Sequence, residues 1–363
     1  MREFLEKYKI ELETIGPVHI GSGITLRKGE WILEWSDQQA IIVSTDKLFE
    51  LLVRKRLLTE YEKFAFSAKG DLLRWMKDHE ISKKERYAIA KYTLDTSGLD
   101  LKNNRIHDLT TTIKDPYGKP YIPGSSLKGA LRNIILAEMI NNSSYDGTSI
   151  KYVIENYTGN AKQLLAGDSI RLNQKFFYTK KISDKPNDAV NDIMSGLRVS
   201  DSNSVELEKL TLCQKVDAGI DGKTTDLPIV RECIIPGTKF EFDLTIDRTE
   251  TNLTVKYIEK AINNFLKAYN QLFLSNFHEE VNYESQVIYL GGGVGFPSKT
   301  VLNQLFQNER NRVKITADTL NKIYPNKHHE DIAKGVSPRV VKLTEIEGQL
   351  LQMGPCRLAI SAV

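Results

Sequence analysis

The chain has 363 residues with 40% hydrophobic content, and its 50 Lys and Arg residues nearly balance 47 Asp and Glu residues, which leaves a formal net charge of +3. This length and content predict two domains with substantial apolar cores. The near-neutral balance excludes an argument for nucleic-acid binding from net charge, so any such function must depend on local basic patches.

Cysteine and histidine spacing argues against a metal centre, and no cofactor is expected. The three cysteines are widely spaced without a Cys-x-x-Cys pair, which is also unlike a disulfide framework. None of the six histidines forms a ligand pair at helical spacing. The N-terminal segment is too charged for a signal sequence and no apolar run could span a bilayer, so a cytoplasmic protein without membrane contact is expected.

The first elements of the chain are predicted to be a strand, a hairpin and a group of helices. Residues 8–20 begin with alternating apolar and charged side chains, the period-two pattern of a half-buried strand. Segments 31–35 and 40–43 predict a short hairpin. Residues 45–92 are helical in pattern and rich in Lys, Arg and Glu, and we interpret them as a helical insertion.

Residues 120–132 join a tight Pro-Gly turn to the basic start of a helix. Ser125 or Ser126 is expected to cap this helix. Lys128 and Arg132 lie four residues apart on one face, and with the partial positive charge of a helix N-terminus they predict an anion-binding corner suited to phosphate. The competing interpretation is an ordinary capped amphipathic helix with solvated basic residues.

Two well-known phosphate motifs are excluded by the order of the residues. A P-loop ends in Gly-Lys followed by Ser or Thr, whereas here Lys128 precedes Gly129 and Ala130, which leaves no hydroxyl to hold magnesium. The glycine cluster at residues 291–299 has Phe296 where a dinucleotide-binding loop requires its third glycine. ATP hydrolysis and a Rossmann cofactor site are therefore not expected.

The second half of the chain repeats the order of strand, helix, strand and glycine-rich loop. Residues 239–247 alternate cleanly as a strand, and a helix over residues 253–277 follows. A strand at 287–290 enters the glycine loop, and residues 349–360 form a closing strand. The repeated order indicates split β-α-β units.

From this order we expect an α+β protein with two ferredoxin-like, RRM-like domains. The polar, interrupted stretch at residues 141–226 predicts long loops around a few short elements, with the domain boundary near its end. The first domain would cover residues 1–225, including the helical insertion, and the second would cover residues 226–363.

Three turns of small residues stand near a strand end or a helix start, where backbone can approach a ligand closely. Because cations lie near each turn, we expect the turns to share one long ligand, with Lys and Arg neutralising RNA phosphates. Each turn taken alone also fits an ordinary structural role. The predicted RNA-binding residues are Gly21, Ser22, Gly23, Arg27, Lys28, Ser125, Ser126, Lys128, Arg132, Gly291, Gly292, Gly293, Gly295 and Lys299.

His19 ends the first predicted strand beside the Gly-Ser-Gly turn. In that place it could act as the general base that cleaves RNA at a 2'-hydroxyl. A packed or hydrogen-bonded strand histidine is the competing interpretation.

Motifs along nearly the whole chain resemble the RAMP proteins of CRISPR effector complexes. The most specific match is IPGSSLKGALR at residues 122–132. The other matching segments are GPVHIGSG at 16–23, LRVSDS at 197–202, LGGGVGF at 290–296, SKT at 298–300 and LQMG at 351–354. Within that family, the length and the Gly-rich Ser-Lys-Thr stretch look most like the fifth subunits of type III-A Csm complexes.

The resemblance implies two ferredoxin-like RAMP domains that bind the guide RNA (crRNA), dock on the terminal backbone subunit and cap the filament at the crRNA 3' end. Contact with the small helical subunit, and recruitment of host nucleases that trim the crRNA in antiviral defence, are also implied. Backbone subunits of the family cut target RNA with an aspartate after the first glycine turn, but residues 21–30 of this chain contain only Glu30 as a carboxylate.

Two functions therefore remain open at this stage. In the first, the protein is a non-catalytic crRNA-binding and assembly subunit, in which Lys128, Arg132 and Lys299 contact phosphates. In the second, it is a metal-independent RAMP ribonuclease that processes precursor crRNA, with His19 or His107 as base and a lysine that stabilises the phosphorane.

Overall fold

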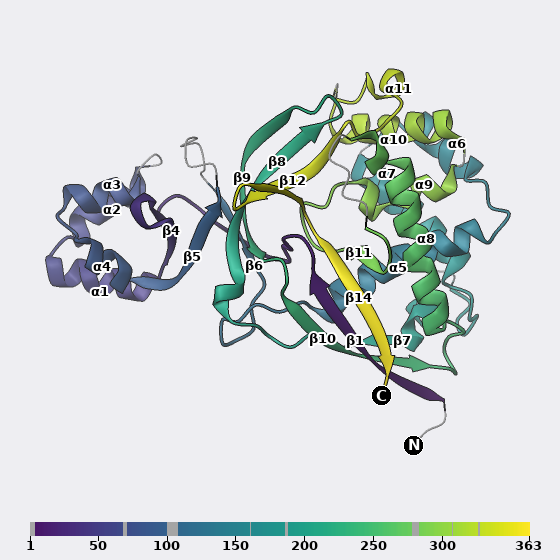
Figure 1. The fold of residues 1–363 in the computed structure, drawn as a ribbon, viewed down its shortest axis with the longest axis horizontal. Helices are drawn as coiled ribbons and strands as arrows, with labels where there is room; N and C mark the ends of the chain where they lie inside the picture. Colours follow the sequence, from purple (N-terminus) through teal and green to yellow (C-terminus); the bar gives the residue numbers. More distant parts are fainter. Residues whose placement is uncertain are drawn as a thin grey trace.

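The computed structural model describes residues 4–67, 71–99, 108–159, 161–185, 188–277, 283–306, 308–325 and 327–363. Within these residues the strands form one five-stranded and one nine-stranded sheet, with most helices on one side of them and a smaller N-terminal group of helices on the other (Figure 1). The expected mixed fold of helices and strands is confirmed. No helix in the described part of the chain has both the length and the apolar character to cross a membrane.

The five-stranded sheet is antiparallel throughout, in the order β11-β14-β1-β10-β7. Along the chain, β1, α5, β7, β10, α8 and β14 follow in the β-α-β-β-α-β order of a ferredoxin-like unit. The bounds of its elements are β1 Leu5–Thr14, α5 Gly124–Asn141, β7 Leu197–Val199, β10 Lys239–Asp247, α8 Val255–Leu272, β11 Val287–Tyr289 and β14 Pro355–Ala362.

Side-chain periodicity explains why α5 and α8 cover one face of this sheet. Ile10 and Leu12 of β1 are fully buried, whereas the charged residues that alternate with them, Lys9, Glu11 and Glu13, point to the opposite face. The helices supply apolar residues at spacings of three and four, such as Leu127 and Leu131 on α5 and Ile262 on α8, which join the same core. The predicted strand at 239–247 and the helix predicted within 253–277 are confirmed.

The nine-stranded sheet has the order β2-β6-β9-β8-β5-β4-β3, with β12 paired to β8 and β13 paired to β12. The predicted hairpin is β3 and β4, which pair in antiparallel register. The strands are β2 Gly21–Leu26, β3 Trp31–Glu34, β4 Gln39–Val43, β5 Ala90–Gly98, β6 Leu109–Thr112, β8 Leu210–Gly219, β9 Thr224–Ile234, β12 Val340–Ile346 and β13 Gln349–Gln352.

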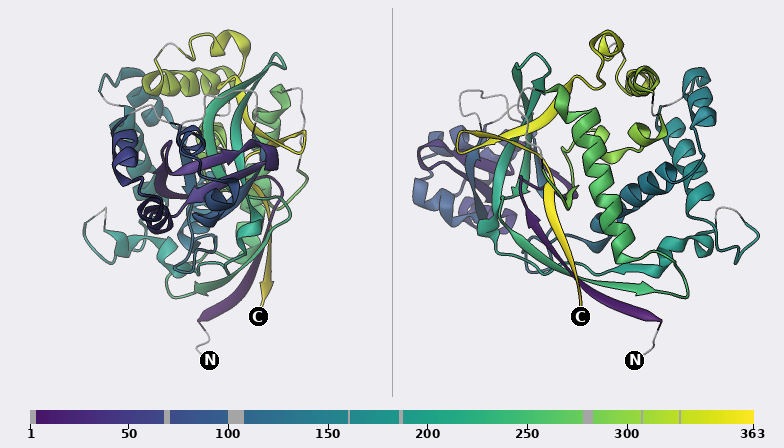
Figure 2. Two further views of the ribbon diagram at one scale, coloured as in Figure 1. Left: turned by 90° about the vertical axis from the view of Figure 1, so that its left-hand side faces the viewer. Right: turned by 45° about the vertical axis from the view of Figure 1, so that its right-hand side comes forward.

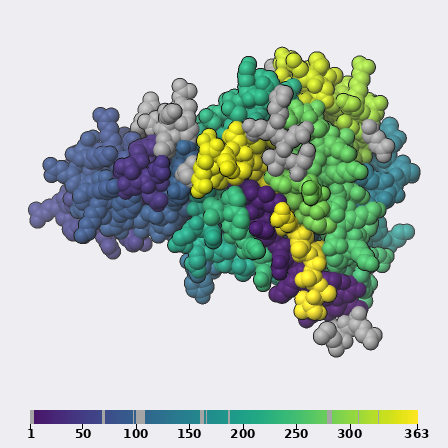
Figure 3. Space-filling view, viewed as in Figure 1, coloured from purple at the N-terminus to yellow at the C-terminus, as the bar shows by residue number. Residues whose placement is uncertain are grey.

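The predicted helical insertion forms a lobe that projects from the body (Figures 1 and 3). Its own apolar core includes Leu52, Trp75 and Met76. The last residues of the predicted insertion, 90–92, belong to β5 instead. The helices are α1 Thr45–Lys55, α2 Leu58–Phe66, α3 Leu72–Asp78 and α4 Lys83–Ala88.

The stretch predicted as long loops, residues 141–226, is more ordered than its sequence suggests. It contains two helices, β7, β8 and the start of β9, and the helices pack with C-terminal ones beside α5 and α8 (Figure 2). Polar surface positions mask the amphipathic pattern of these helices, since their apolar residues join a core made mainly by other segments. The remaining helices are α6 Thr148–Asn156, α7 Ala161–Phe176, α9 Leu302–Leu305, α10 Glu309–Ile323 and α11 Asp331–Lys334.

The prediction of a single closing strand over 349–360 is wrong. The segment divides into β13 and β14, which belong to different sheets. The break falls at Gly354, which has φ of +86° and whose Cβ, if present, would lie 2.1 Å from Val294. Its backbone N–H and C=O are taken by Pro17 and Leu290, so the chain crosses between sheets here.

The predicted domain boundary between residues 225 and 226 falls inside β9. The ferredoxin-like unit takes β1 and β7 from before this point, and β10 and β14 from after it. The division into two RAMP domains stays a prediction, and any second unit would be interleaved with the first along the chain.

Candidate functional site

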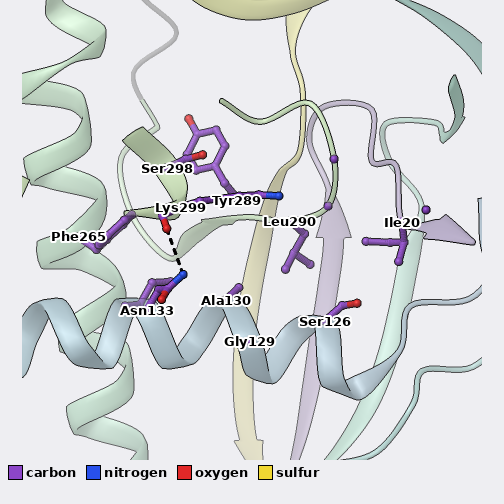
Figure 4. Close-up of a pocket in the computed structure, with 14 residues that line it drawn as sticks. Ile20, Ser126, Gly129, Ala130, Asn133, Phe265, Tyr289, Leu290, Ser298 and Lys299 are labelled. Atoms are coloured by element: carbon purple, nitrogen blue, oxygen red, sulfur yellow. Dashed lines mark hydrogen bonds between the residues drawn. The ribbon is translucent and has the colours of Figure 1, made fainter. Parts of the chain in front are cut away.

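A pocket of about 390 Å³ opens where α5, α8, the loop after β11 and the short helix η6 (Pro297–Lys299) meet (Figure 4). Residues from all three predicted small-residue turns line it. The lining residues are Ile20, Gly21, Ser126, Gly129, Ala130, Asn133, Ile134, Phe265, Tyr289, Leu290, Gly291, Gly292, Ser298 and Lys299.

One face of α5 forms a wall of the pocket with small, uncharged residues. Gly129 and Ala130 lie three and four residues after Ser126, and Asn133 lies four and three residues after them, so the four share a helix face. The side-chain amide of Asn133 donates to the backbone oxygen of Lys299 at 3.3 Å, which ties the helix to η6. Apart from its chain neighbours and the nearby backbone of its own helix, a Cβ on Gly129 would meet no atom within 4 Å, so packing against the rest of the protein does not require glycine there.

A short β-bridge joins the first and third turns. The backbone N–H of Gly292 donates to the carbonyl oxygen of His19 at 2.7 Å. Gly291 has φ of +81°, and a Cβ at this residue would lie 2.2 Å from the same oxygen, so glycine is needed for this close approach. The sequence separation between the turns hides this pairing.

Two cations lie near enough to influence each other beside the glycine loop. Burial lowers the pKa of Lys299, and the positive charge of Arg231 on β9 lowers it further. Arg231 also lies near Gly293, whose Cβ, if present, would be 3.6 Å from an Arg231 guanidinium nitrogen. Among the described residues neither cation forms an ion pair, and no Asp or Glu lines the pocket.

Sequence reasoning missed Arg231. It follows the buried Val230 and precedes the fully buried Glu232, so it reads as an ordinary polar position of a strand. Only the fold brings it to the third turn.

The two basic residues of the α5 motif lie away from the pocket. The Arg132 guanidinium donates to Asp192 at 2.7 Å, donates twice to Asn173 and stacks 4.2 Å from the ring of Phe177. Lys128 is half-buried on the same side, and burial lowers its pKa while Asp192 acts in the opposite direction. The helix therefore presents Arg132 to neighbouring protein segments and its small residues to the pocket.

The N-terminus of α5 is already occupied by a carboxylate of the protein. Gly124 is the first helical residue, and its backbone N–H donates to Asp201 at 2.8 Å. The prediction that Ser125 or Ser126 caps the helix is wrong, because no side chain of the N-cap, Pro123, or its neighbours makes a capping bond. The carboxylate of Asp201 takes the place of the predicted phosphate at the first helical N–H.

The remaining predicted residues are spread around the pocket. Arg27 and Lys28 are exposed beyond the end of β2 that lies away from Gly21. Ser22 shares a hydrogen bond of 2.6 Å with Thr111, and Gly23 and Ser125 are exposed.

Glu30 and Gly295 lie outside the pocket lining as well. The Glu30 carboxylate accepts from the backbone N–H of Arg27 at 2.8 Å, which stabilises its own turn. Gly295 lies beside Lys342, whose ammonium is paired with Asp217.

His19 lies directly behind the pocket and is 4% exposed. Its Nδ1 lies 2.7 Å from the backbone oxygen of Glu232, and burial lowers the pKa of the ring. His107, the other candidate base, lies outside the described residues. Among the described residues no group of three or more His, Cys, Asp or Glu side chains is placed to hold a metal ion.

Residues 11–332 match the RAMP superfamily, and the chain belongs to that family. Among curated relatives it is similar to the CRISPR system Cms protein Csm5 of Streptococcus thermophilus, at 29% identity over 86% of each chain. It is also 26% identical to the protein of the same name from Mycobacterium tuberculosis, over 99% of each chain. The resemblance recognised in the motifs is thus confirmed.

Solved structures show the same fold. A chain of the cryo-EM structure of a Csm-crRNA-target RNA ternary complex in a type III-A CRISPR-Cas system aligns with a TM-score of 0.65 at 18% identity, over 97% of this chain and all of the other. The crystal structure of T. onnurineus Csm5 aligns with a TM-score of 0.60 at 18% identity, over 96% of this chain and 99% of the other.

Proposed function

We propose that this chain is a non-catalytic crRNA-binding subunit of a type III-A Csm effector complex. It would cap the backbone filament at the crRNA 3' end and support crRNA maturation in antiviral defence. Similarity to Csm5 proteins over nearly the full length of both chains supports membership of such a complex.

The neighbouring cations Lys299 and Arg231 beside the glycine loop are the observation that carries the RNA-binding proposal. Like charges held together without a carboxylate repel each other, and an anion bound between them removes that cost. Lys299 and Arg231 are two such like charges. They lie beside the pocket that residues of all three turns line. An RNA phosphate fits the site because its charge would pair with both cations.

The open helix face beside these cations supports the same proposal. Glycine inside a helix costs about 0.5–1 kcal/mol relative to alanine. Gly129 carries that cost although the protein leaves space for a methyl group. A sugar-phosphate strand lying along Ser126, Gly129 and Asn133 would use that space.

The proposed partners are the crRNA and the terminal backbone RAMP subunit of the complex. The small helical subunit and host trimming nucleases are further proposed partners, and the cytoplasm is the proposed location. The projecting helical lobe (α1–α4) offers a surface distinct from the pocket, so RNA and protein contacts would not compete.

The alternative function, a ribonuclease that processes precursor crRNA, has one observation in its favour. A backbone oxygen only accepts hydrogen bonds, so the proton of the His19 ring is on Nδ1 and Nε2 keeps a lone pair. A neutral imidazole beside a phosphate site has the form of a general base.

Binding and cleavage of one labelled substrate separate the two functions. End-labelled precursor crRNA is incubated with the purified protein, with and without the backbone subunit and a divalent metal ion. A backbone-dependent shift with intact RNA is expected. Discrete cuts by the protein alone, lost in His19→Ala, would establish the ribonuclease instead.

The phosphate site is tested in the same assay with charge reversals. Lys299→Glu should weaken crRNA binding, whereas Lys334→Glu, a reversal at an exposed residue of α11, should not. Equal affinities of the two variants would contradict a phosphate contact at Lys299.

A further inference from the structure

The His19 ring is held in one tautomer with one edge unused. Its Nδ1–H donates to the carbonyl oxygen of Glu232 at 2.7 Å, which fixes both the ring orientation and the position of the proton. Among the described residues, Nε2 has no hydrogen-bond partner. His19, which is only 4% exposed, therefore keeps a free acceptor.

This free edge lies against two residues that line the pocket. A Cβ on Gly21 would be 3.3 Å from Nε2, and a Cβ on Gly292 would be 3.0 Å from the adjacent ring carbon and 3.9 Å from Nε2. Neither glycine has a positive φ, so the backbone conformation does not require glycine at either position. Larger residues would crowd the ring and cover its free edge.

The surroundings of the ring keep it neutral. Desolvation lowers the pKa of His19, the positive charges of Arg231 and Lys114 lower it further, and the backbone oxygen and side chain of Glu232 oppose them. At neutral pH the ring thus offers an acceptor and no second donor. A ligand group that meets Nε2 must be a hydrogen-bond donor.

We propose that His19 reads the sugar of the bound strand, with Nε2 accepting a hydrogen bond from a ribose 2'-hydroxyl, so that the pocket selects RNA over DNA. The inference rests on the proposed binding of a nucleic-acid strand in this pocket. Phosphate contacts are the same for RNA and DNA, and the 2'-hydroxyl is the donor by which a protein distinguishes them. Lys299 and Arg231 would supply affinity, and His19 would supply sugar selectivity.

A pair of substitutions separates this role from a structural one. In His19→Asn the amide nitrogen replaces Nδ1 and keeps the bond to Glu232, while the acceptor at Nε2 is lost. In His19→Gln the amide oxygen reaches the position of Nε2 and keeps an acceptor, while the Nδ1 bond is lost. A structural role predicts the larger effect on binding for Gln, and sugar reading predicts it for Asn.

The measurement is the affinity of the full chain for single-stranded RNA and for its all-deoxy counterpart of the same base sequence. Wild-type protein should prefer RNA. His19→Asn should lose about 2–10-fold in RNA affinity, the range of one neutral hydrogen bond, with unchanged DNA affinity. His19→Gln should keep most of the preference.

Single-position substitution of the RNA keeps the test decisive even if a variant folds poorly. With wild-type protein, 2'-deoxy and 2'-fluoro groups are placed at one nucleotide at a time, because fluorine preserves the ribose pucker but cannot donate. At the nucleotide over His19 both should weaken binding equally. Equal affinity for every 2'-fluoro RNA, or equal loss of RNA and DNA affinity in His19→Asn, would overturn the proposal.

The same titrations distinguish an error in the proposed strand binding from an error in the proposed sugar contact. If strand binding in the pocket is wrong, Lys299→Glu leaves both RNA and DNA affinity unchanged. If only the sugar contact is wrong, Lys299→Glu weakens both strands while His19→Asn does not change their ratio.

Discussion

The two faces of α5 differ in what their residues still have to offer a ligand. The face with Lys128 and Arg132 carries the charge, but Arg132 is fully engaged with Asp192, Asn173 and Phe177. The face with Gly129 and Asn133 carries no charge, yet it borders the pocket where Lys299 and Arg231 have no ion-pair partner among the described residues. The basic motif thus lies on the face of α5 turned away from the pocket, and the cations beside the pocket come from other segments of the chain.

The largest effect is expected from removing Arg132, which lies on the face of α5 that contacts other parts of the protein. Arg132→Ala removes the ion pair and the hydrogen bonds that hold α5 to α7 and the following loop, and it leaves Asp192 unpaired. The free energy of unfolding should fall by about 2–3 kcal/mol, measured by chemical denaturation. RNA affinity of the folded protein should stay within twofold; a selective loss of affinity without loss of stability would return Arg132 to the RNA site.

Next in size is the effect of removing the unpaired cation on β9. Arg231→Ala should weaken RNA binding about tenfold, because one charge-assisted contact is lost. The slope of log affinity against log salt concentration should fall by about 0.7 per lost phosphate contact with a single strand. Stability should not decrease, since a like-charge repulsion with Lys299 is removed.

Arg310→Ala is the matched control for that change. Arg310 is exposed on α10, so its removal subtracts the same charge at another place. An equal reduction of affinity and salt slope in both variants would mean that net charge, and not the pocket, drives binding.

A smaller effect is expected from substituting Gly129, where stability should rise while RNA affinity falls. Gly129→Ala should raise the free energy of unfolding by about 0.5–1 kcal/mol, because alanine favours the helix and has space. RNA affinity should fall, since the added methyl occupies the strand's path. Gly167→Ala in α7 provides the control, with the same helical gain and no expected change in binding.

The smallest effect is the pH dependence contributed by His19. Burial lowers its pKa in the folded protein, whereas the unfolded chain has the ordinary value of about 6.5. Above that value both states are neutral; below it the unfolded chain binds a proton first, so stability is lost as the pH falls. Wild-type protein should lose more stability than His19→Asn between pH 7.5 and 5.5, and parallel curves would contradict a lowered pKa.

Local patterns were enough to predict the elements that have one buried face. β10 follows from clean alternation, α8 from apolar residues at helical spacing, and the β3–β4 hairpin from two short apolar runs. The helices α6 and α7 were missed because their polar surface residues dominate a weak apolar pattern. The pairing of strands could not be predicted from the sequence either. β1 lies between β10 and β14, and no local pattern in these strands indicates which strands pair or in which register.

The candidate site was predicted only in part, because local motifs can be seen in the sequence and contacts between distant residues cannot. Small-residue turns are visible in sequence, and Gly21, Ser126 and Gly291 do meet in one pocket. Whether a cation forms an ion pair depends on carboxylates far away in the sequence. The sequence therefore could not distinguish Arg132, which is paired, from Arg231, which has no ion pair among the described residues. The carboxylate at the start of α5 comes from Asp201, a residue outside the motif that suggested an anion there.

The position of β1 has a consequence for how the protein folds. Tyr8 in β1 pairs with Ala362 in β14, and Leu5 pairs with Asp247 in β10. A ribosome therefore releases β1 long before either neighbour exists, and the strand waits with both edges open. Such non-local pairing slows folding and exposes intermediates to aggregation. We expect chains that lack β14 to accumulate as aggregates, because the central strand of the ferredoxin-like sheet would then remain an edge.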